Sequence, residues 1–357
     1  MEYECNELIS VIVPAYNAEA FIDQTLSSAL AQTYRHLEII VIDDGSSDRT
    51  AELVKARADQ DLRIRLIRQK NSGVAAARNL GIREARGKFI APLDADDLWH
   101  PEKLQRQIEV MRTGGQSVGL VYTWCSSVDG DGRIINRAAS DATVMDFVYE
   151  TLLYFNFIIS ASVPLIRKDC LVEVGGYDQN LRVQDAEGCE DLKLYLAIAE
   201  KWKISAVPAF LVGYRMTANS MTSNVRRMKR SHELVLADAR SRHPELPERI
   251  FRWSRGFNYF WMGIVALKKR QTALAMELLT AAIINDPGMI LRVRWQLLRF
   301  IRPAWAFAVL RLTGKPSLRG QMFIKLPAPD FEKVPALDKW PSARRIRQIG
   351  TQLEVMQ

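Results

Sequence analysis

Residues 70–98, KNSGVAAARNLGIREARGKFIAPLDADDL, carry the pattern of a turn, a helix and a strand in that order. The apolar run at residues 89–93 is typical of a strand buried on both faces of a parallel sheet. Three aspartates, Asp94, Asp96 and Asp97, follow this strand directly. Ligands of open α/β sheets bind at the carboxyl ends of the strands, and carboxylates there suit a hard divalent cation. The segment therefore predicts an α/β fold with an acidic site at one sheet edge.

The sequence on the N-terminal side of this segment repeats the same alternation of strand and helix. It predicts strands at residues 8–13, 37–42, 63–67 and 88–93, and helices at residues 17–32, 49–57 and 74–85. Ser47 or Asp48 is expected to cap the second helix. Alternating strands and helices with continuously apolar strands predict a parallel sheet covered on both faces. Residues 14–17, 43–44 and 94–97 should then meet at one edge.

The rest of the chain divides into a mixed middle and a helical end. The middle predicts strands at residues 118–125, 157–166 and 210–216, with helices after Pro101 and at residues 169–174 and 190–201. From residue 225 the pattern is helical, and residues 253–267 and 272–284 resemble one tetratricopeptide-type helix pair. Residues 289–312 also read as a helix, and a proline-rich stretch follows. We therefore expect a catalytic domain at 1–224, a helical domain at 225–315 and an irregular tail at 316–357.

Composition indicates a globular protein of 357 residues with a net charge of +8. The four cysteines form no CxxC pair, which favours free thiols in a reducing, cytoplasmic compartment. No apolar run reaches the roughly 18 residues of a spanning helix, and the acidic N-terminus does not resemble a signal peptide. Positive charge gathers after residue 225, where a basic helical segment suits either an anionic membrane surface or docking on the catalytic domain. Nucleic acid is not an expected partner, because no nucleic-acid motif accompanies the charge.

Five motifs in register resemble glycosyltransferase family 2. They are ISVIVPAYNAEAFIDQTLSSALAQT, IIVIDDGSSDRT, KNSGVAAARNLGIREARGKFIAPLDADD, VGGYD and CEDLKLYLAIA, within residues 8–224. The resemblance implies a GT-A fold, a Rossmann-like mixed sheet sandwiched by helices, here with an all-helical C-terminal domain. It also implies an inverting glycosyltransferase that uses a nucleoside diphosphate sugar, with a UDP-sugar expected, and Mn²⁺ or Mg²⁺ as cofactor.

The resemblance also implies a set of site residues. The residues expected to bind the nucleotide sugar are Pro14, Ala15, Tyr16, Asn17, Glu19, Asp43, Asp44, Asn71, Gly73, Arg78, Asp94, Ala95, Asp96 and Asp97. Within this set, the Tyr16 ring would lie against the base, Asp44 would contact the base or ribose, and Asp96 would bind the metal. Asp191, preceded by Glu190, is expected to be the catalytic base.

Each of these motifs has a simpler structural interpretation. Residues 14–17 and 43–48 favour a turn and a helix N-cap. Arg78 on its own reads as a surface arginine, and Asp97 as a helix cap. Acidic residues at 190–191 stabilise a helix start through the macrodipole. The agreement of five motifs along the chain favours the catalytic interpretation over these alternatives.

One position departs from the family pattern. Relatives often carry a histidine after the last strand, in YRxH, whereas this chain has Thr217. Thr217 is a poor metal ligand, so Arg215 or Ser220 is expected to contact the diphosphate instead. The expected acceptor is a surface glycan or its lipid carrier at the cytoplasmic face of a membrane. Two alternative functions are a nucleotidyltransferase and a non-catalytic nucleotide-binding module. A nucleotidyltransferase would need a glycine-rich loop with a lysine directly after the first strand, and this sequence lacks one there.

Overall fold

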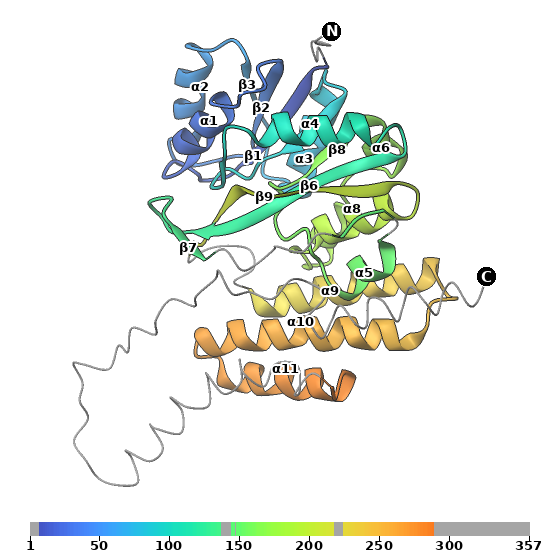
Figure 1. Cartoon of the computed structure of the whole chain (residues 1–357). Coiled ribbons are helices and arrows are strands. Elements are labelled where there is room, and N and C mark those ends of the chain that lie inside the picture. The colour runs from blue at the N-terminus through green and yellow to red at the C-terminus, as the bar shows by residue number, and fades with distance from the viewer. Residues whose placement is uncertain (1–6, 137–143, 147, 218–223, 289–357) are drawn as a thin grey trace, which may run out of the picture. The chain divides into compact units, whose positions relative to one another are not determined.

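The computed structural model describes residues 7–136, 144–146, 148–217 and 224–288. The chain divides into two compact units, Met1–Pro247 and Glu248–Gln357. The first unit is built on a nine-stranded sheet with the order β3-β2-β1-β4-β8-β6-β9-β5, and β7 pairs with β6 outside this path (Figure 1). The predicted fold class, a mixed α/β sheet followed by helices, is confirmed.

Four parallel strands form the half of the sheet that the sequence predicted. They are β1 Ile9–Ala15, β2 Leu37–Asp43, β3 Ile64–Arg68 and β4 Phe89–Pro92. Every residue of β1, β2 and β4 is buried, which explains their mostly apolar sequence, and the buried polar side chains of Ser10 and Glu38 bond each other at 2.6 Å. Ala15 lies opposite Asp43, and Ile12 lies opposite Pro92. The carboxyl ends of β1, β2 and β4 therefore meet at one edge, as expected.

The other half of the sheet mixes directions. It contains β5 Leu98–Trp99, β6 Val118–Val128, β7 Ile134–Asn136, β8 Leu165–Arg167 and β9 Lys203–Arg215. β8 is antiparallel to both β4 and β6, and β6 runs parallel to β9. The predicted strand at residues 157–166 is wrong over most of its length, because only Leu165–Arg167 pairs. Ser160 and Ser162 instead donate hydrogen bonds to a buried aspartate, and that contact holds their segment as a loop.

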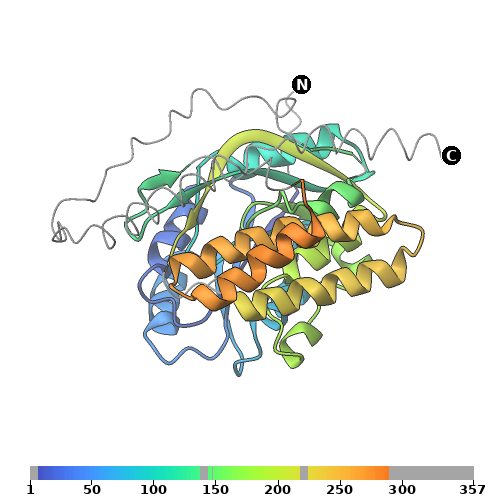
Figure 2. The same ribbon diagram turned by 90° about the horizontal axis from the view of Figure 1, so that it is seen from below.

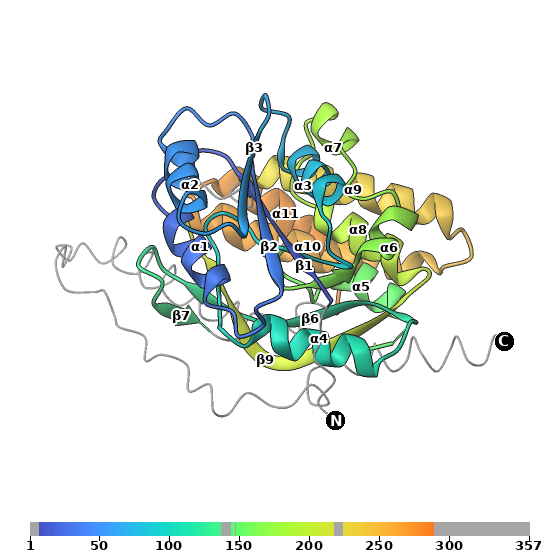
Figure 3. The same ribbon diagram turned by 90° about the horizontal axis from the view of Figure 1, so that it is seen from above.

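Helices cover both faces of the sheet. The longer ones are α1 Ile22–Leu30, α2 Thr50–Ala58, α3 Val74–Glu84, α4 Lys103–Thr113, α8 Glu190–Ala199 and α9 Val225–Arg242. The shorter ones are α5 Tyr149–Tyr154, α6 Lys168–Glu173 and α7 Asn180–Val183. Figure 3 shows α1 and α2 to one side of the parallel strands and α3 and α8 to the other. The N-cap residue of α2 is Arg49, without a side-chain cap bond, so the expected cap by Ser47 or Asp48 is wrong; the Asp48 carboxylate instead accepts from the backbone N–H of Thr50 at 3.0 Å.

Helix α9 packs with the sheet unit, whereas the sequence prediction began a separate helical domain at residue 225. Ser231, His232, Val235 and Leu236 of this helix are buried, and α9 contacts α8. The Ser231 hydroxyl accepts from the backbone N–H of Cys189 at 3.0 Å. These contacts move the boundary of the first compact unit to Pro247.

The described part of the second unit is a pair of packed helices, α10 Glu248–Lys268 and α11 Thr272–Asn285 (Figure 2). Gly263 lets them approach closely, because a Cβ there would lie 2.9 Å from the Leu279 side chain. The predicted helix at residues 289–312 and the tail at 316–357 lie outside the described residues. Within the described residues, no helix is long and apolar enough to span a bilayer.

Candidate active site

Tyr16, Asp44 and Asp94 lie at the edge where β1, β2 and β4 end. The backbone N–H of Asp44 donates to the Ala15 carbonyl at 2.8 Å, and the N–H of Leu93 donates to the Ile12 carbonyl at 2.9 Å. Tyr16 is 55% exposed. An exposed aromatic side chain at this edge offers a stacking surface for a base.

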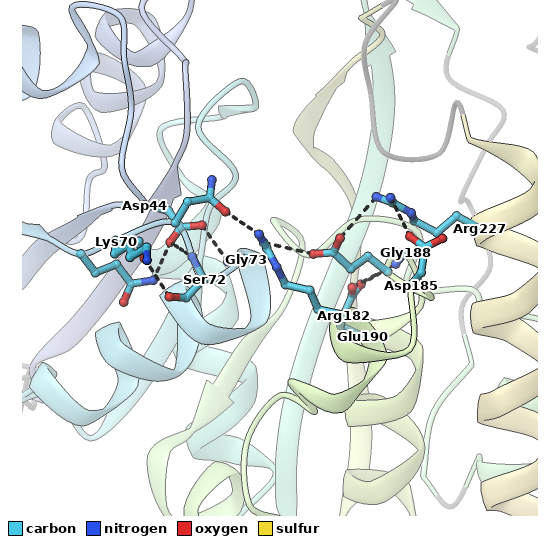
Figure 4. A network of polar contacts seen from close by, with 12 residues as sticks. Asp44, Lys70, Ser72, Gly73, Arg182, Asp185, Gly188, Glu190 and Arg227 are labelled. Carbon is cyan, nitrogen blue, oxygen red and sulfur yellow. Dashed lines mark hydrogen bonds and ion pairs between the residues drawn. The ribbon is translucent and has the colours of Figure 1, made fainter.

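The Asp44 carboxylate organises the loop that precedes α3. It accepts hydrogen bonds from the backbone N–H groups of Ser72 and Gly73, both at 2.8 Å, and from Gln69 Nε2 at 2.7 Å (Figure 4). Its neighbour Asp43 is fully buried and pairs with Arg68 Nε at 2.8 Å. Both carboxylates therefore accept hydrogen bonds from protein groups and stabilise the loops of the site.

Asn17 and Glu19 join the loop after β1 to the loop after β2. Asn17 adopts a left-handed backbone conformation, φ 48°, which asparagine tolerates well. Its Oδ1 accepts from the Ser47 N–H at 2.9 Å, and Glu19 Oε2 accepts from the Arg49 N–H at 3.1 Å. These two predicted ligands thus fix the loops around Tyr16, while Pro14 and Ala15 belong to buried β1.

Asp97 is fully buried and ties three segments together. Its Oδ2 accepts from the hydroxyls of Ser160 and Ser162 at 3.0 and 2.6 Å, and its Oδ1 accepts from the N–H of Arg215 at 2.9 Å. Burial and the charges of Asp94 and Asp96 raise its pKa well above the usual range. Neither predicted role for Asp97, sugar contact or helix cap, matches this geometry; the side chain is sealed from ligand and caps no helix.

Replacement of Asp97 by alanine is expected to destabilise the fold by about 3 kcal/mol, since three buried donors would lose their acceptor. Urea unfolding measures this loss. Asp97→Asn is the matched control, because its amide retains one acceptor and the serine hydroxyls can reorient to accept. Equal stability of the alanine variant and the wild type would refute the structural role.

Asp96 is the carboxylate of this motif that is best placed to bind a cation. Within the described residues, the structure gives its side chain no hydrogen bond or ion pair to another residue, and burial together with the charge of Asp94 raises its pKa to about 6. A cation would relieve both effects. The described residues contain no cluster of three acidic, histidine or cysteine side chains that could hold a metal. One protein carboxylate completed by ligand oxygens and water fits Mg²⁺ or Mn²⁺ in a nucleotide site.

Arg78 is buried, so the interpretation of a surface arginine is wrong. It is 5% exposed, its Nη2 lies 2.5 Å from Asp94 Oδ1, and its guanidinium lies 5.1 Å from the centre of the Tyr177 ring. Asn79, the next residue of α3, bonds the Tyr177 backbone in both directions, at 2.7 and 2.9 Å. Arg78 is thereby locked beside Asp94.

Asp191, the expected base, is the second residue of α8 and has a raised pKa. Burial, followed by the charge of Glu190, raises its pKa to about 7, and the Arg78 guanidinium opposes this rise. Glu190 is buried, and its carboxylate accepts from the backbone N–H of Gly188 at 2.9 Å. Burial also raises the pKa of Glu190. Because Arg78 pairs with Asp94 and also acts on Asp191, it connects the acidic strand end to the expected base.

Arg215 does not have the role that the sequence suggested. It is 1% exposed, its Nε donates to the Asp96 carbonyl at 2.6 Å, and its Nη1 donates to the carbonyls of Asp129 and Gly130. Its guanidinium is therefore occupied within the protein and holds the backbone of Asp96. Ser220 lies outside the described residues, and Thr217 is the last residue described before that gap.

Sequence reasoning missed several residues that contact the predicted site residues or the loops around them. Tyr177 lay in the quoted VGGYD motif, a signal that could have assigned it. Ser160, Ser162 and Arg182 gave no such signal, because their partners lie far away in the sequence.

The structure places an exposed tyrosine and acidic side chains at one edge of a mixed α/β sheet, and solved structures share this fold. The mannosyltransferase PcManGT of Pyrobaculum calidifontis, solved with GDP-Man and Mn²⁺, superposes with a TM-score of 0.54 at 19% identity, over 86% of this chain and 88% of that one. TarS residues 1–349 of S. aureus, solved with UDP-GlcNAc, gives 0.52 at 17% identity, over 81% and 92%. The shared fold is GT-A.

Sequence comparison identifies the family. The model of glycosyl transferase family 2 matches residues 10–161. A Bacillus subtilis protein named as a teichuronic acid biosynthesis glycosyltransferase, TuaG, is 30% identical over 223 residues, which are 61% of this chain and 82% of that protein. Chondroitin synthase of Escherichia coli is 36% identical over 130 residues, 36% of this chain and 19% of the synthase. The chain belongs to glycosyltransferase family 2.

The aligned region covers only a part of some longer relatives. An uncharacterized glycosyltransferase of Rickettsia conorii is 32% identical over 217 residues, but the chain spans only 34% of its length. Family membership removes support from the nucleotidyltransferase alternative.

Proposed function

We propose that this chain is an inverting, metal-dependent glycosyltransferase that moves a sugar from a nucleoside diphosphate sugar, with a UDP-sugar expected, to a hydroxyl of a glycan or lipid-linked acceptor. The observation that carries the proposal is the position of Arg78. It pairs with Asp94 at the donor edge, and its charge also acts on Asp191, whose pKa is about 7. A base with a pKa near neutrality suits proton abstraction from a hydroxyl.

The proposed reaction is a single displacement. Asp191 takes the proton from the acceptor hydroxyl as its oxygen attacks the anomeric carbon. The new glycosidic bond forms while the bond from that carbon to the diphosphate oxygen breaks, and the electron pair leaves with the nucleoside diphosphate. Attack from the face opposite the leaving group inverts the anomeric centre, so no covalent enzyme intermediate is needed.

The donor would lie along the edge of β1, β2 and β4. The exposed Tyr16 ring provides a stacking face for the base, and Asp44 holds the loop at Asn71 and Gly73 in shape beside it. Asp94, fixed by Arg78, is available through its second oxygen to a ribose or sugar hydroxyl. Asp96 would hold Mn²⁺ or Mg²⁺, which when bound neutralises charge on the departing diphosphate.

The acceptor class rests on relatives and on charge. TuaG is named for teichuronic acid biosynthesis, and the E. coli relative for chondroitin synthesis; both products are polysaccharides. The basic C-terminal third of the sequence suits an anionic membrane surface. We therefore propose surface polysaccharide synthesis in the cytoplasm, at the inner face of a membrane.

Thermal unfolding with UDP, GDP, dTDP and CMP, each with and without Mn²⁺, tests the donor class. A ligand that binds only the folded state increases the free energy of unfolding, by about 2.7 kcal/mol at a hundred times Kd, and so raises Tm. We expect a Mn²⁺-dependent rise with UDP. A rise with GDP alone would replace the UDP assignment, and no rise with any nucleotide would contradict the proposed function.

The pH dependence of transfer should report Asp191. The base acts only when ionised, so kcat/KM is expected to rise with pH up to about 7 and then level off. Glu190→Gln removes the neighbouring charge that raises this pKa, so the inflection should move to lower pH. Burial, the larger cause, remains, and the shift will be partial. An unchanged inflection in this variant would indicate that another group controls the profile.

A further inference from the structure

A chain of polar contacts links the donor loop to the loop that precedes the base. Arg182 Nη2 donates to Asn71 Oδ1 at 2.6 Å, and Arg182 Nη1 lies 3.5 Å from Glu187 Oε1 (Figure 4). Asn71 and Arg182 are 111 residues apart. Arg182 also covers Gly73, where a Cβ would lie 2.5 Å from Arg182 Nη1. One guanidinium thus contacts both loops with separate nitrogens.

Helix α9 holds the other side of the same loop. Arg227 pairs with Asp185 at 2.7 Å and with Glu187 at 3.3 Å. Met228 covers Gly188, where a Cβ would lie 2.2 Å from its Sδ. The loop needs such support because Asp185 has a φ of 49°, a left-handed conformation that costs a residue with a side chain free energy. Gly188, at φ 130°, adopts a conformation that glycine reaches readily.

This loop sets the position of the base. Gly188 donates to both oxygens of Glu190, and Asp191 follows at the start of α8. A shift of residues 185–188 would therefore move Glu190 and the start of the helix that carries Asp191.

We propose that Arg182 is a positioning residue that couples the two loops, so that donor binding at residues 71–73 orders the loop that positions Asp191. This inference rests on the proposed function. Arg182 is suited to the task because its planar fork holds two nitrogens in fixed positions, one toward each partner, whereas lysine has a single nitrogen. Its side chain is 41% exposed, and ion pairs at such exposure contribute little to stability. Substitution should therefore leave the fold intact.

Amide hydrogen exchange with UDP and Mn²⁺ tests the coupling without any turnover. In the wild type, the ligand is expected to slow exchange in both segments, 70–73 and 185–189. In Arg182→Ala and Arg182→Lys, it should slow exchange only at 70–73. Arg106→Ala is the matched control, because Arg106 pairs with Glu102 on α4 at comparable exposure, and it should behave as the wild type.

The outcomes separate the coupling from the proposed function. Protection at 70–73 without protection at 185–189 in the wild type overturns the coupling and leaves the donor site intact. Protection of both segments in Arg182→Ala overturns it as well. If the ligand does not slow exchange at 70–73 in the wild type, both the proposed donor site and the coupling are refuted.

Steady-state kinetics gives the second readout. At saturating donor, Arg182→Ala is expected to lower kcat about tenfold, and Asn71→Ala to do the same from the donor side. The double variant should lose no more than either single variant, since both remove one link. Additive losses, or an effect on the donor KM alone, would show that Arg182 contributes only to binding or to the fold.

Discussion

Asp191→Asn is expected to lower kcat by about 10³-fold and to leave UDP affinity within about twofold of the wild type. The amide is nearly isosteric but accepts no proton, so the acceptor hydroxyl would attack without a base. The Asp191 Oδ1 contact to the Leu192 N–H at 2.7 Å can be retained by the amide oxygen, which preserves the start of α8. Initial rates at saturating donor and calorimetric titration with UDP measure the two quantities.

Asp169→Asn is the matched control for this substitution. Asp169 is likewise in the first turn of a helix, α6, but is exposed and away from the sheet edge. It should transfer sugar at the wild-type rate. Unchanged transfer in Asp191→Asn would exclude Asp191 as the base, and lost UDP binding would indicate a role in the donor site instead.

Asp96→Asn is expected to abolish the Mn²⁺-dependent part of the UDP-induced rise in Tm and to lower kcat/KM by at least about 10²-fold. The described residues supply no cluster of ligands that could replace this carboxylate. The thermal shift with UDP, measured with and without Mn²⁺, isolates the metal contribution from the nucleotide contribution.

Asp131→Asn provides the control for Asp96, because Asp131 is an exposed turn aspartate paired with the exposed Arg133. Its Mn²⁺ response should match the wild type. If Asp96→Asn kept the Mn²⁺-dependent rise, the cation would have to bind elsewhere, with Asp94 as the first position to examine.

The parallel half of the sheet could be predicted from the sequence because its signals are local. β1, β2 and β4 are mostly apolar, and each is followed by polar turn residues. The prediction failed at residues 157–166, where apolar residues suggest a strand but Ser160 and Ser162 bond Asp97 instead. That contact joins residues more than 60 positions apart, and no local pattern reveals it.

The candidate site shows the same division. The motifs located Tyr16, Asp96 and Asp191 at positions where the structure keeps an exposed ring or a carboxylate with a raised pKa. They did not distinguish these residues from Asp44 and Asp97, whose carboxylates are used inside the fold. A carboxylate looks the same in sequence whether it faces a ligand or a backbone N–H, and only tertiary contacts decide which.

The packing of α9 determines how the protein can be cut. The sequence pattern changes at residue 225, but a fragment ending there would lose Arg227, Met228 and Ser231, which contact residues 185–189. It would also uncover the apolar surface that buries Val235 and Leu236. A fragment meant to retain the arrangement around Asp191 therefore has to extend to Pro247, and insertions or fusions that respect this boundary preserve the region on which the chemistry depends.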